Sequence, residues 1–455
     1  MSDASYIQGL IERARKAMDE VKDYTQEQAD AMVFAAAKAV YDNAEVLAKQ
    51  AVEESGLGRV DHKIGKNQIT PFAVWEHLKD KKSVGVIDED KEKGIIYVAH
   101  PAGVIGAISP TTNPNVTPLV NFMQAAKGLN AVIVSPHPRA EHTTNYTCEL
   151  IREAIAKLGA PKDLLICIEG ATVEKSAELM KQCDLIVATG GPALTIAAYS
   201  SGTPALGVGP GNPSTILDKG FDLAEAAKIM LESAGFDNGV LCDGSNSMLY
   251  PKEEEAELFR ELNKVGFAIY TNEKDVEAFR KGIFPDGAHM DKDLVGKDAA
   301  VILKACGFDA PKGVEAIGFK VNKFGAGEIL TKEILGPTLA LKSYDTFEEA
   351  VEMAARNLKE NGGIGHGTGI LSHNKDHIMY AGTHMPVSRF LINQPTSDGW
   401  GPVTNGLIAT ASEGCGTWGN NSLSENVDYI DQLNITRIVR KLDTKDLPDM
   451  AEVFR

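Results

Sequence analysis

An α/β fold with two or three domains is the class that the sequence predicts, and three observations lead to it. From about residue 103, short runs rich in Val, Ile and Ala alternate with amphipathic segments, the pattern of parallel strands that are each followed by a helix. The pattern restarts beyond a glycine-rich junction near residue 235, which indicates a second α/β unit. The 455 residues, 43% of them hydrophobic, suffice for more than one sizeable core.

The N-terminal part is predicted to be helical and to end in a β-hairpin. Thr25 and Gln28 form a capping-box pattern at the start of a long Ala-rich helix, and Gly56 and Gly58 end the helical region. Residues 84–100 then place two β-rich runs around a charged turn, which predicts a hairpin. Because an isolated hairpin has unpaired edges, we expect it to project and to pair with a second subunit, in a homodimer or a homotetramer.

Two series of strands and helices follow. In the first series we expect strands at GVIGAIS, AVIVS, DLLICI and DLIVAT, with helices from Val116 to Lys127, after Arg139 and through Met180. In the second series, strands at NSMLY and AIY flank the helix KEEEAELFRELNKV. From LNITRIV onward, the C-terminal residues predict a short strand and an exposed tail.

Charge and composition exclude several classes of function. There are 46 lysines and arginines against 63 aspartates and glutamates, and the net charge of -17 repels a nucleic-acid backbone. No apolar stretch reaches the roughly 18 residues of a membrane span, and the N-terminus has no apolar signal core, so we expect a cytoplasmic protein without a membrane partner. The six cysteines form no CxxC pair, which is typical of a reducing compartment, and the histidines have no metal-ligand spacing, so we expect no metal site.

Three polar and glycine-rich segments begin where predicted strands end, at 107–118, 188–213 and 236–247. Ligands bind at the carboxyl ends of strands in open α/β sheets, so these segments are candidates for a functional site, with tight turns as the alternative. Cys242 in the third segment follows an Asn-Gly turn and is the candidate nucleophile, because a thiol is reactive even when little of it is ionised. Most single cysteines are buried and inert, and Cys415 in EGCGTWGNN is the rival of Cys242.

Two further groups suit acyl chemistry at a thiol. Asn113 can offer its side-chain amide to the charge that develops on a carbonyl oxygen, although an Asn-Pro turn explains the same residue. The TGGP segment at 189–192 precedes a helix, so its backbone amides can meet a phosphate. The glycines at 207–211 imitate a dinucleotide-binding pattern, but Pro210 and Pro213 prevent a helix from following, and we expect a shaped loop.

Seven motifs occur in order along the chain: PTTNP at 110–114, SPHPRA at 135–140, ATGGP at 188–192, AAYSSGTPALGVGPGN at 197–212, FDNGVLC at 236–242, KEILGP at 332–337 and GCGTWGNNSLSEN at 414–426. With them the chain resembles the coenzyme A-acylating branch of the aldehyde dehydrogenase superfamily, which includes acylating succinate-semialdehyde dehydrogenases and the aldehyde half of bifunctional aldehyde-alcohol dehydrogenases. The resemblance implies the fold of that family, with a Rossmann-like cofactor-binding domain at 1–235 that carries the oligomerisation hairpin, a catalytic domain at 236–418, and a C-terminal return and tail at 419–455.

The resemblance also implies a reaction, in which an aldehyde, coenzyme A and NAD(P)+ are converted reversibly into an acyl-CoA and NAD(P)H. It implies that Cys242 attacks the aldehyde, that hydride then leaves to form a thioester, and that Asn113 and the backbone amide of Cys242 hold the oxyanion. Glu333 would bind the nicotinamide ribose. The other cofactor contacts that the resemblance implies are Pro110, Thr111, Thr112, Ser135, His137, Arg139, Thr189, Gly190, Gly191, Gly209 and Leu335.

The stretch GVGPGN at 207–212 stands where hydrolytic relatives carry a Glu-Leu-Gly-Gly motif, whose carboxylate activates water. Without that base, transfer to coenzyme A is favoured over formation of a free acid, because the thiol of coenzyme A is partly ionised near neutral pH. A hydrolytic aldehyde dehydrogenase is the second hypothesis. A non-catalytic paralogue kept for assembly is the third.

Departures from the family pattern bear on the aldehyde. Asp243 replaces the small or neutral residue that usually follows the nucleophile, and its carboxylate opposes an anionic aldehyde. Leu371 replaces a second histidine in GHGTGILS, and residues 393–406 replace a longer loop, so with His366 they are expected to shape the aldehyde pocket. Resemblance favours succinate semialdehyde, whereas Asp243 favours a neutral or cationic short aldehyde, with acetaldehyde, propionaldehyde and butyraldehyde as neutral examples; sulfoacetaldehyde is a further alternative.

The choice between NAD and NADP stays open in the sequence. SPHPRA at 135–140 offers no carboxylate for the ribose hydroxyls of NAD, and His137 and Arg139 suit the additional phosphate of NADP. Relatives with the same string use either cofactor.

Overall fold

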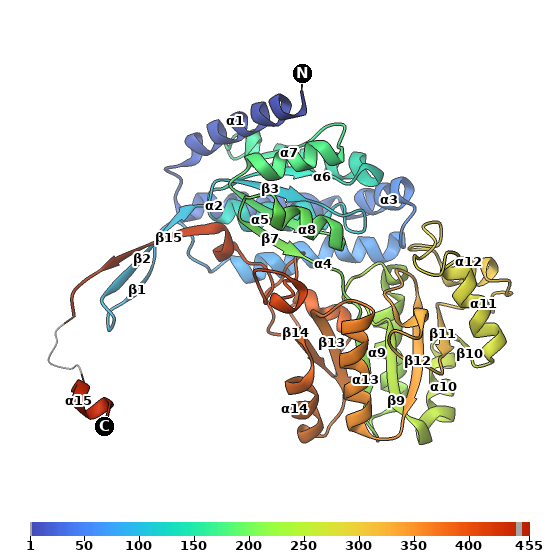
Figure 1. Cartoon of the computed structure of the whole chain (residues 1–455). Coiled ribbons are helices and arrows are strands. Elements are labelled where there is room, and N and C mark those ends of the chain that lie inside the picture. Colours follow the sequence, from blue (N-terminus) through green and yellow to red (C-terminus); the bar gives the residue numbers. More distant parts are fainter. Residues whose placement is uncertain (1, 443–447) are drawn as a thin grey trace.

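The computed structural model describes residues 2–442 and 448–455 and confirms an α/β architecture, here built on three sheets. A five-stranded and a seven-stranded parallel sheet form the cores of two units, and a three-stranded antiparallel sheet projects from one side (Figure 1). Within the described residues, no helix is both long and apolar enough to cross a membrane.

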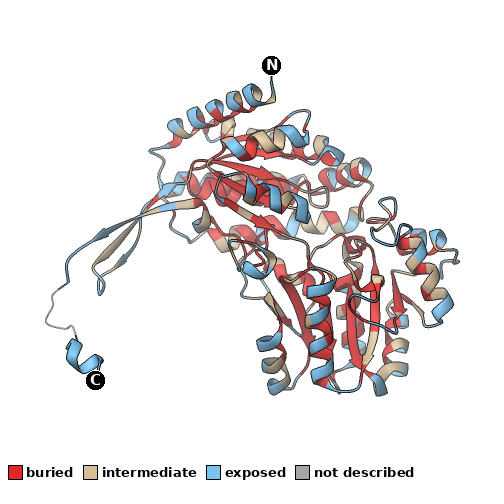
Figure 2. Cartoon of the chain, viewed as in Figure 1, coloured by how far each residue is buried: buried red, intermediate tan, exposed pale blue. Residues whose placement is uncertain are grey.

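The first unit is a parallel sheet with the order β5-β4-β3-β6-β7. Its strands are β3 (Val104–Ile108), β4 (Ala131–Ser135), β5 (Leu165–Cys167), β6 (Leu185–Thr189) and β7 (Ala205–Val208). Its helices are α1 (Asp3–Val21), α2 (Gln26–Asp42), α3 (Ala44–Ser55), α4 (Val60–Leu78), α5 (Val116–Lys127), α6 (Glu141–Ala156), α7 (Val173–Gln182) and α8 (Pro192–Ser200). The predicted capping box at Thr25 and Gln28 starts α2. The central strands are buried over their whole length, because helices cover the sheet, and this explains their continuous apolar sequences (Figure 2).

The second unit is a parallel sheet with the order β10-β11-β12-β9-β8-β13-β14. Its strands are β8 (Ser214–Leu217), β9 (Ser247–Pro251), β10 (Phe267–Tyr270), β11 (Ala316–Lys320), β12 (Thr338–Tyr344), β13 (Gly365–Leu371) and β14 (Val387–Ile392). Its helices are α9 (Leu223–Gly235), α10 (Glu255–Lys264), α11 (Glu273–Ile283), α12 (Ala299–Ala305), α13 (Phe347–Glu360) and α14 (Lys375–His384). Two of its strands, β8 and β9, pair in the middle of the sheet although a helix separates them in sequence.

The passage between the two units lies earlier than the sequence predicted. We expected the first domain to extend to residue 235, but β8 and α9 precede that position and already belong to the second unit. The chain crosses between the units in the Gly-Pro-rich loop at 209–213, which directly precedes β8. The functions assigned to the domains stay predictions.

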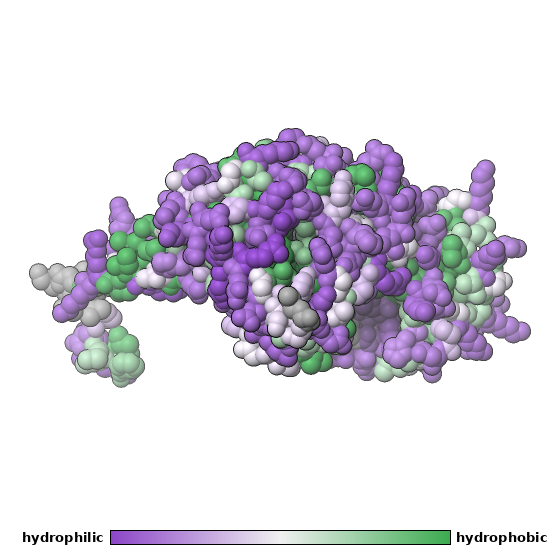
Figure 3. Space-filling view, turned by 90° about the horizontal axis from the view of Figure 1, so that it is seen from above, coloured by the Kyte–Doolittle hydropathy of each residue, from purple (hydrophilic) through white to green (hydrophobic). Residues whose placement is uncertain are grey.

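The projecting sheet joins the hairpin to a strand of the C-terminal region. The predicted hairpin forms β1 (Gly85–Asp90) and β2 (Ile95–Pro101), and the C-terminal strand β15 (Leu433–Val439) pairs with β2 along its whole length. This arm exposes apolar side chains, among them Val86 and Val439 (Figure 3). The short helix α15 (Met450–Val453) follows, and the part of the predicted tail at 443–447 lies outside the described residues. Self-association through this arm stays a prediction.

Candidate active site

A cavity of about 1580 Å³ lies between the two units, and all three segments singled out in the sequence reach it. The carboxyl ends of β3 and β6 open into it, as expected for a parallel sheet. The predicted site residues that line the cavity are Pro110, Thr111, Thr112, Asn113, His137, Thr189, Gly190, Gly191, Gly209, Cys242, Asp243, Glu333, Leu335 and His366.

Three predicted site residues do not line this cavity. Leu371 is fully buried in the core of the second unit, so the expectation that it shapes the aldehyde pocket is corrected. The hydroxyl of Ser135 lies 2.8 Å from that of Ser176, and it is Ser176 that faces the cavity. Arg139 is exposed, and its guanidinium donates to the carbonyl of Ser55 at 3.1 Å.

The loop that carries Cys242 has an unusual backbone. Asp237 and Asn238 both have positive φ values, 51° and 55°, a region that non-glycine residues adopt at a cost of about 1–3 kcal/mol. The side-chain amide of Asn238 holds this path by donating to the carbonyl of Gly296 at 3.1 Å and to Asp298 at 2.9 Å. Cys242 follows this segment, is half-buried and lines the cavity.

Two lysines of α4 connect this loop to Asn113. Asp237 is fully buried and accepts from Lys63 at 2.8 Å and from Lys66 at 2.6 Å. Lys66 also donates to the side-chain oxygen of Asn113 at 3.0 Å, and Lys63 donates to the carbonyl of Thr112 at 3.2 Å. Because the amide oxygen of Asn113 is engaged, its NH2 group is the one left to donate toward a substrate oxygen. The sequence analysis missed both lysines, which resemble ordinary helix-surface residues.

Gly211 explains the close approach of the Gly-Pro-rich loop to the nucleophile. A Cβ atom at this position would lie 1.8 Å from the carbonyl oxygen of Cys242 and 3.1 Å from the ring of His366. Only glycine therefore allows this loop to pack against the cysteine. Residues 207–212, GVGPGN, include no acidic residue, so this loop brings no carboxylate to the thiol.

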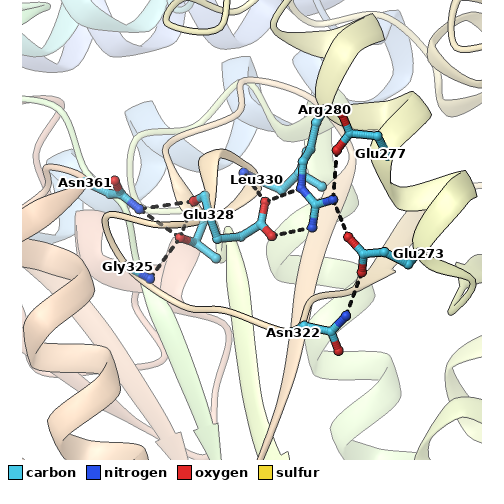
Figure 4. A network of polar contacts seen from close by, with 9 residues as sticks. Glu273, Glu277, Arg280, Asn322, Gly325, Glu328, Leu330 and Asn361 are labelled. Carbon is cyan, nitrogen blue, oxygen red and sulfur yellow. Dashed lines mark hydrogen bonds and ion pairs between the residues drawn. The ribbon is translucent and has the colours of Figure 1, made fainter.

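Glu333 lines the cavity, and the segment that precedes it in sequence is anchored in the second unit by a network around Glu328 (Figure 4). Arg280 on α11 pairs with the buried carboxylate of Glu328 at 2.5 and 2.9 Å, and Asn361 donates to the hydroxyl of Thr331 at 2.8 Å. This network fixes the turn that directly precedes Glu333. Burial raises the pKa of Glu333 to about 8, which suits a carboxyl group that hydrogen-bonds to hydroxyls inside a closed site.

Ionisable side chains surround the thiol. The sulfur of Cys242, a ring nitrogen of His366 and a carboxylate oxygen of Glu413 all lie within 4.8 Å of one another. Burial, followed by the carboxylates of Glu413, Asp243 and Glu333, raises the pKa of the Cys242 thiol well above its usual value. Burial lowers the pKa of His366, which favours the neutral ring, and its Nδ1 atom has no hydrogen-bond partner among the described residues.

Glu413 is a further residue of the cavity that sequence analysis missed. It follows Cys242 by 171 positions and lies in a loop with no local pattern that marks it. The Cys242 thiol, His366 and Glu413 are of types that bind metals, whereas histidine spacing predicted no metal site.

The rival cysteine lies behind the cavity wall. Cys415 is 1% exposed, does not line the cavity, and its thiol donates to the backbone carbonyl of Glu413 at 3.5 Å. Burial raises its pKa. Of the two candidates, Cys242 is the one whose sulfur faces the cavity.

The residues present fit a dinucleotide. Gly191 caps the N-terminus of α8, and a Cβ atom there would meet nothing within 4 Å, so a phosphate can approach the first backbone amides of the helix. Thr189 and His137 line the same region, and Glu333 and Cys242 lie farther along the cavity. The volume of about 1580 Å³ is large enough for a dinucleotide and an aldehyde together.

Comparison with known proteins gives the same result for sequence and for fold. Residues 1–273 match the aldehyde dehydrogenase family. The chain is 42% identical to the acetylating succinate-semialdehyde dehydrogenase of Clostridium kluyveri over the whole length of both proteins. It is 38% identical to the bifunctional aldehyde-alcohol dehydrogenase of Escherichia coli, with 97% of this chain and 50% of that protein aligned. Its fold is similar to that of an acetylating aldehyde dehydrogenase from Geobacillus thermoglucosidasius, with a TM-score of 0.93, 32% identity and 98% of both chains covered.

Proposed function

The chain belongs to the aldehyde dehydrogenase family and to its coenzyme A-acylating branch, and from this premise we propose how its own residues carry the reaction. An aldehyde, coenzyme A and NAD(P)+ give an acyl-CoA, NAD(P)H and a proton. The observation that carries the proposal is that Cys242, Asn113 and Glu333, from three separate segments, face one cavity with His366 beside the thiol.

The first half of the reaction begins at Cys242. Its sulfur bonds to the aldehyde carbon while its proton passes to His366, which is near enough and neutral. The amide of Asn113, oriented by Lys66, and the backbone N–H of Cys242 stabilise the negative charge on the former carbonyl oxygen. When bound, the nicotinamide cofactor supplies the hydride acceptor. Loss of hydride leaves a thioester on Cys242.

In the second half the thiol of coenzyme A attacks this thioester. After the first proton has left His366 for solvent, the ring takes the proton of the attacking thiol, the bond between the acyl carbon and the Cys242 sulfur breaks, and the acyl-CoA leaves. Cys242 then regains a proton. Because one thioester replaces another, each step also runs in reverse, from acyl-CoA to aldehyde.

Product analysis tests the acylating assignment. We expect purified protein with aldehyde and NAD(P)+ to form acyl-CoA when coenzyme A is present, and less than about a tenth as much free acid when it is absent. Chromatography of both products, with NADH or NADPH formation followed in parallel, measures the ratio and the cofactor preference. Abundant free acid without coenzyme A would contradict the proposal and would indicate that Glu413 activates water.

The aldehyde is proposed to be short. The name of the Clostridium kluyveri relative suggests succinate semialdehyde, and the neutral short-chain aldehydes and sulfoacetaldehyde are alternatives. These candidates differ in the charge of the group at the end of the molecule opposite the aldehyde. Asp243 and Glu413 line the part of the cavity that this group would meet.

The raised pKa of Cys242 predicts a strong pH dependence for its alkylation. Below the pKa the thiolate fraction increases about tenfold per pH unit, so the rate of reaction with iodoacetamide is expected to rise by that factor for each unit between pH 7 and 9. Glu413→Gln removes one of the carboxylates that raise this pKa and is expected to accelerate alkylation at pH 8 about threefold to tenfold.

Mass spectrometry of the Cys242 peptide measures this rate. Glu425→Gln is the matched control, because Glu425 is an exposed carboxylate of the same C-terminal region. A rate that levels off below pH 8 would contradict a raised pKa.

A further inference from the structure

Two carboxyl side chains form one wall of the cavity beside the nucleophile. Asp243 directly follows Cys242, and Glu413 comes from a distant loop, yet both line the cavity and are only 3% and 6% exposed. A carboxylate oxygen of Glu413 lies within 4.8 Å of the Cys242 sulfur. Glu413 Oε2 has no hydrogen-bond partner, which is rare for a buried carboxylate.

The positive charge of Arg389, which faces the two carboxyl groups, does not neutralise both of them. The Nε atom of Arg389 lies 3.2 Å from Oε2 of Glu413 but is not aligned for a hydrogen bond. Its Nη1 atom donates instead to the carbonyl of Gly414 at 2.8 Å and to Asn426 at 3.2 Å. Arg389 does not line the cavity, so a ligand meets the carboxyl groups first.

The charge count therefore leaves a deficit of one positive charge. Two carboxyl groups and one guanidinium are buried together, and the remaining cation at the cavity, Lys66, is engaged by Asp237 and Asn113. Burial raises the pKa of both Asp243 and Glu413, as does the charge of Glu413 for Asp243, so the pair holds a proton more readily than free carboxyl groups do. A ligand cation would supply the same charge together with hydrogen-bond donors.

We propose that Asp243 and Glu413 form a subsite for a protonated amine on the substrate, so that the preferred substrate is a short amino-substituted aldehyde or its acyl-CoA thioester. This inference rests on the proposed function. An ammonium group offers three donors and a positive charge to the two carboxyl groups, whereas a carboxylate or sulfonate would add a further negative charge to this wall. The short distance from Glu413 to the sulfur requires the amine to lie only a few atoms from the reacting carbon, since a hydrogen bond adds only about 3 Å.

The test compares four thioesters in the reducing direction: 3-aminopropionyl-, butyryl-, 3-hydroxypropionyl- and succinyl-CoA. The first two have the same number of heavy atoms in the acyl chain and differ in the charge at its end. We expect kcat/KM for 3-aminopropionyl-CoA to exceed that for butyryl-CoA by tenfold or more, which corresponds to about 1.4 kcal/mol. In Glu413→Gln and in Asp243→Asn this ratio is expected to fall at least tenfold, and in the control Glu425→Gln it is expected to persist.

The outcomes separate this inference from the function on which it rests. If none of the thioesters, nor acetyl-CoA, is reduced, the proposed function fails. If butyryl-, 3-hydroxypropionyl- or succinyl-CoA is reduced as well as the amino compound or better, the function stands and the ammonium subsite is wrong. An unchanged ratio in both variants overturns the assignment of the two carboxyl groups. If a variant does not fold, the ratio of kcat/KM for 3-aminopropionyl-CoA to that for butyryl-CoA in the wild-type protein tests the ammonium subsite.

Discussion

Cys242→Ala is expected to lower kcat for acyl-CoA reduction at least about a thousandfold, because among the described residues no other cysteine lines the cavity to form the thioester on which both halves of the reaction depend. The cavity supports this expectation, since the sulfur of Cys242 faces the same space as Asn113 and Glu333. Oxidation of NADH or NADPH at saturating acyl-CoA measures the loss. Mass spectrometry of wild-type protein mixed with acyl-CoA should locate the acyl group on the Cys242 peptide.

Cys415→Ala provides the matched control for this prediction. Cys415 is the other cysteine near the site, but its buried thiol faces a backbone carbonyl rather than the cavity. The variant is expected to keep at least about a third of the wild-type rate. Activity that survives in Cys242→Ala and disappears in Cys415→Ala would reverse the assignment of the nucleophile.

Asp237→Ala is expected to lower the free energy of unfolding by about 3–5 kcal/mol, the usual cost of removing one partner from a buried ion pair. The carboxylate of Asp237 is fully buried and accepts from Lys63 and Lys66, so the substitution leaves two ammonium groups facing each other without a counter-charge. It also removes the carboxylate that holds Lys66, the residue that donates to Asn113. Denaturant unfolding of the two proteins measures the difference.

Asp61→Ala serves as the control for Asp237→Ala. Asp61 pairs with Arg59 at the N-terminus of α4, but the side chain of Asp61 is 63% exposed. Surface ion pairs contribute about 0–1 kcal/mol to stability. A loss below about 1 kcal/mol in Asp237→Ala would show that solvent reaches the two lysines. At a temperature where Asp237→Ala is folded, its activity is also expected to be lower than that of the wild-type protein, because Lys66 no longer holds the amide of Asn113 in place.

The strands that were predicted from the sequence and the candidate nucleophile have one property in common, which is a local sequence pattern. Continuous apolar runs mark β3, β4 and β6, and the motif around Cys242 is contiguous. The four-residue strand β8 leaves a weaker pattern, and its place in the second sheet depends on pairing with β9 and β13. Tertiary contacts alone decide such a position.

The missed site residues depend on distant contacts in the same way. Lys63 and Lys66 lie on a helix whose pattern does not reveal the buried aspartate 171 or more positions away. Glu413 joins Asp243 through the return of the C-terminal region to the cavity. Leu371 was misplaced because neither its strand, β13, nor the face on which its side chain packs was predicted from the sequence.

The pairing of β15 with β2 fixes an order of events during synthesis. Roughly 330 residues separate the end of β2 from the start of β15, so at about 5–20 residues per second the ribosome needs roughly a quarter of a minute to one minute to supply the missing strand. During that interval one edge of β2 has no partner in its own nascent chain. The acidic residues Asp88, Glu89 and Asp90 of β1 place charge beside it, which discourages pairing with another nascent chain. Completion of this sheet therefore requires that the chain has been translated through β15.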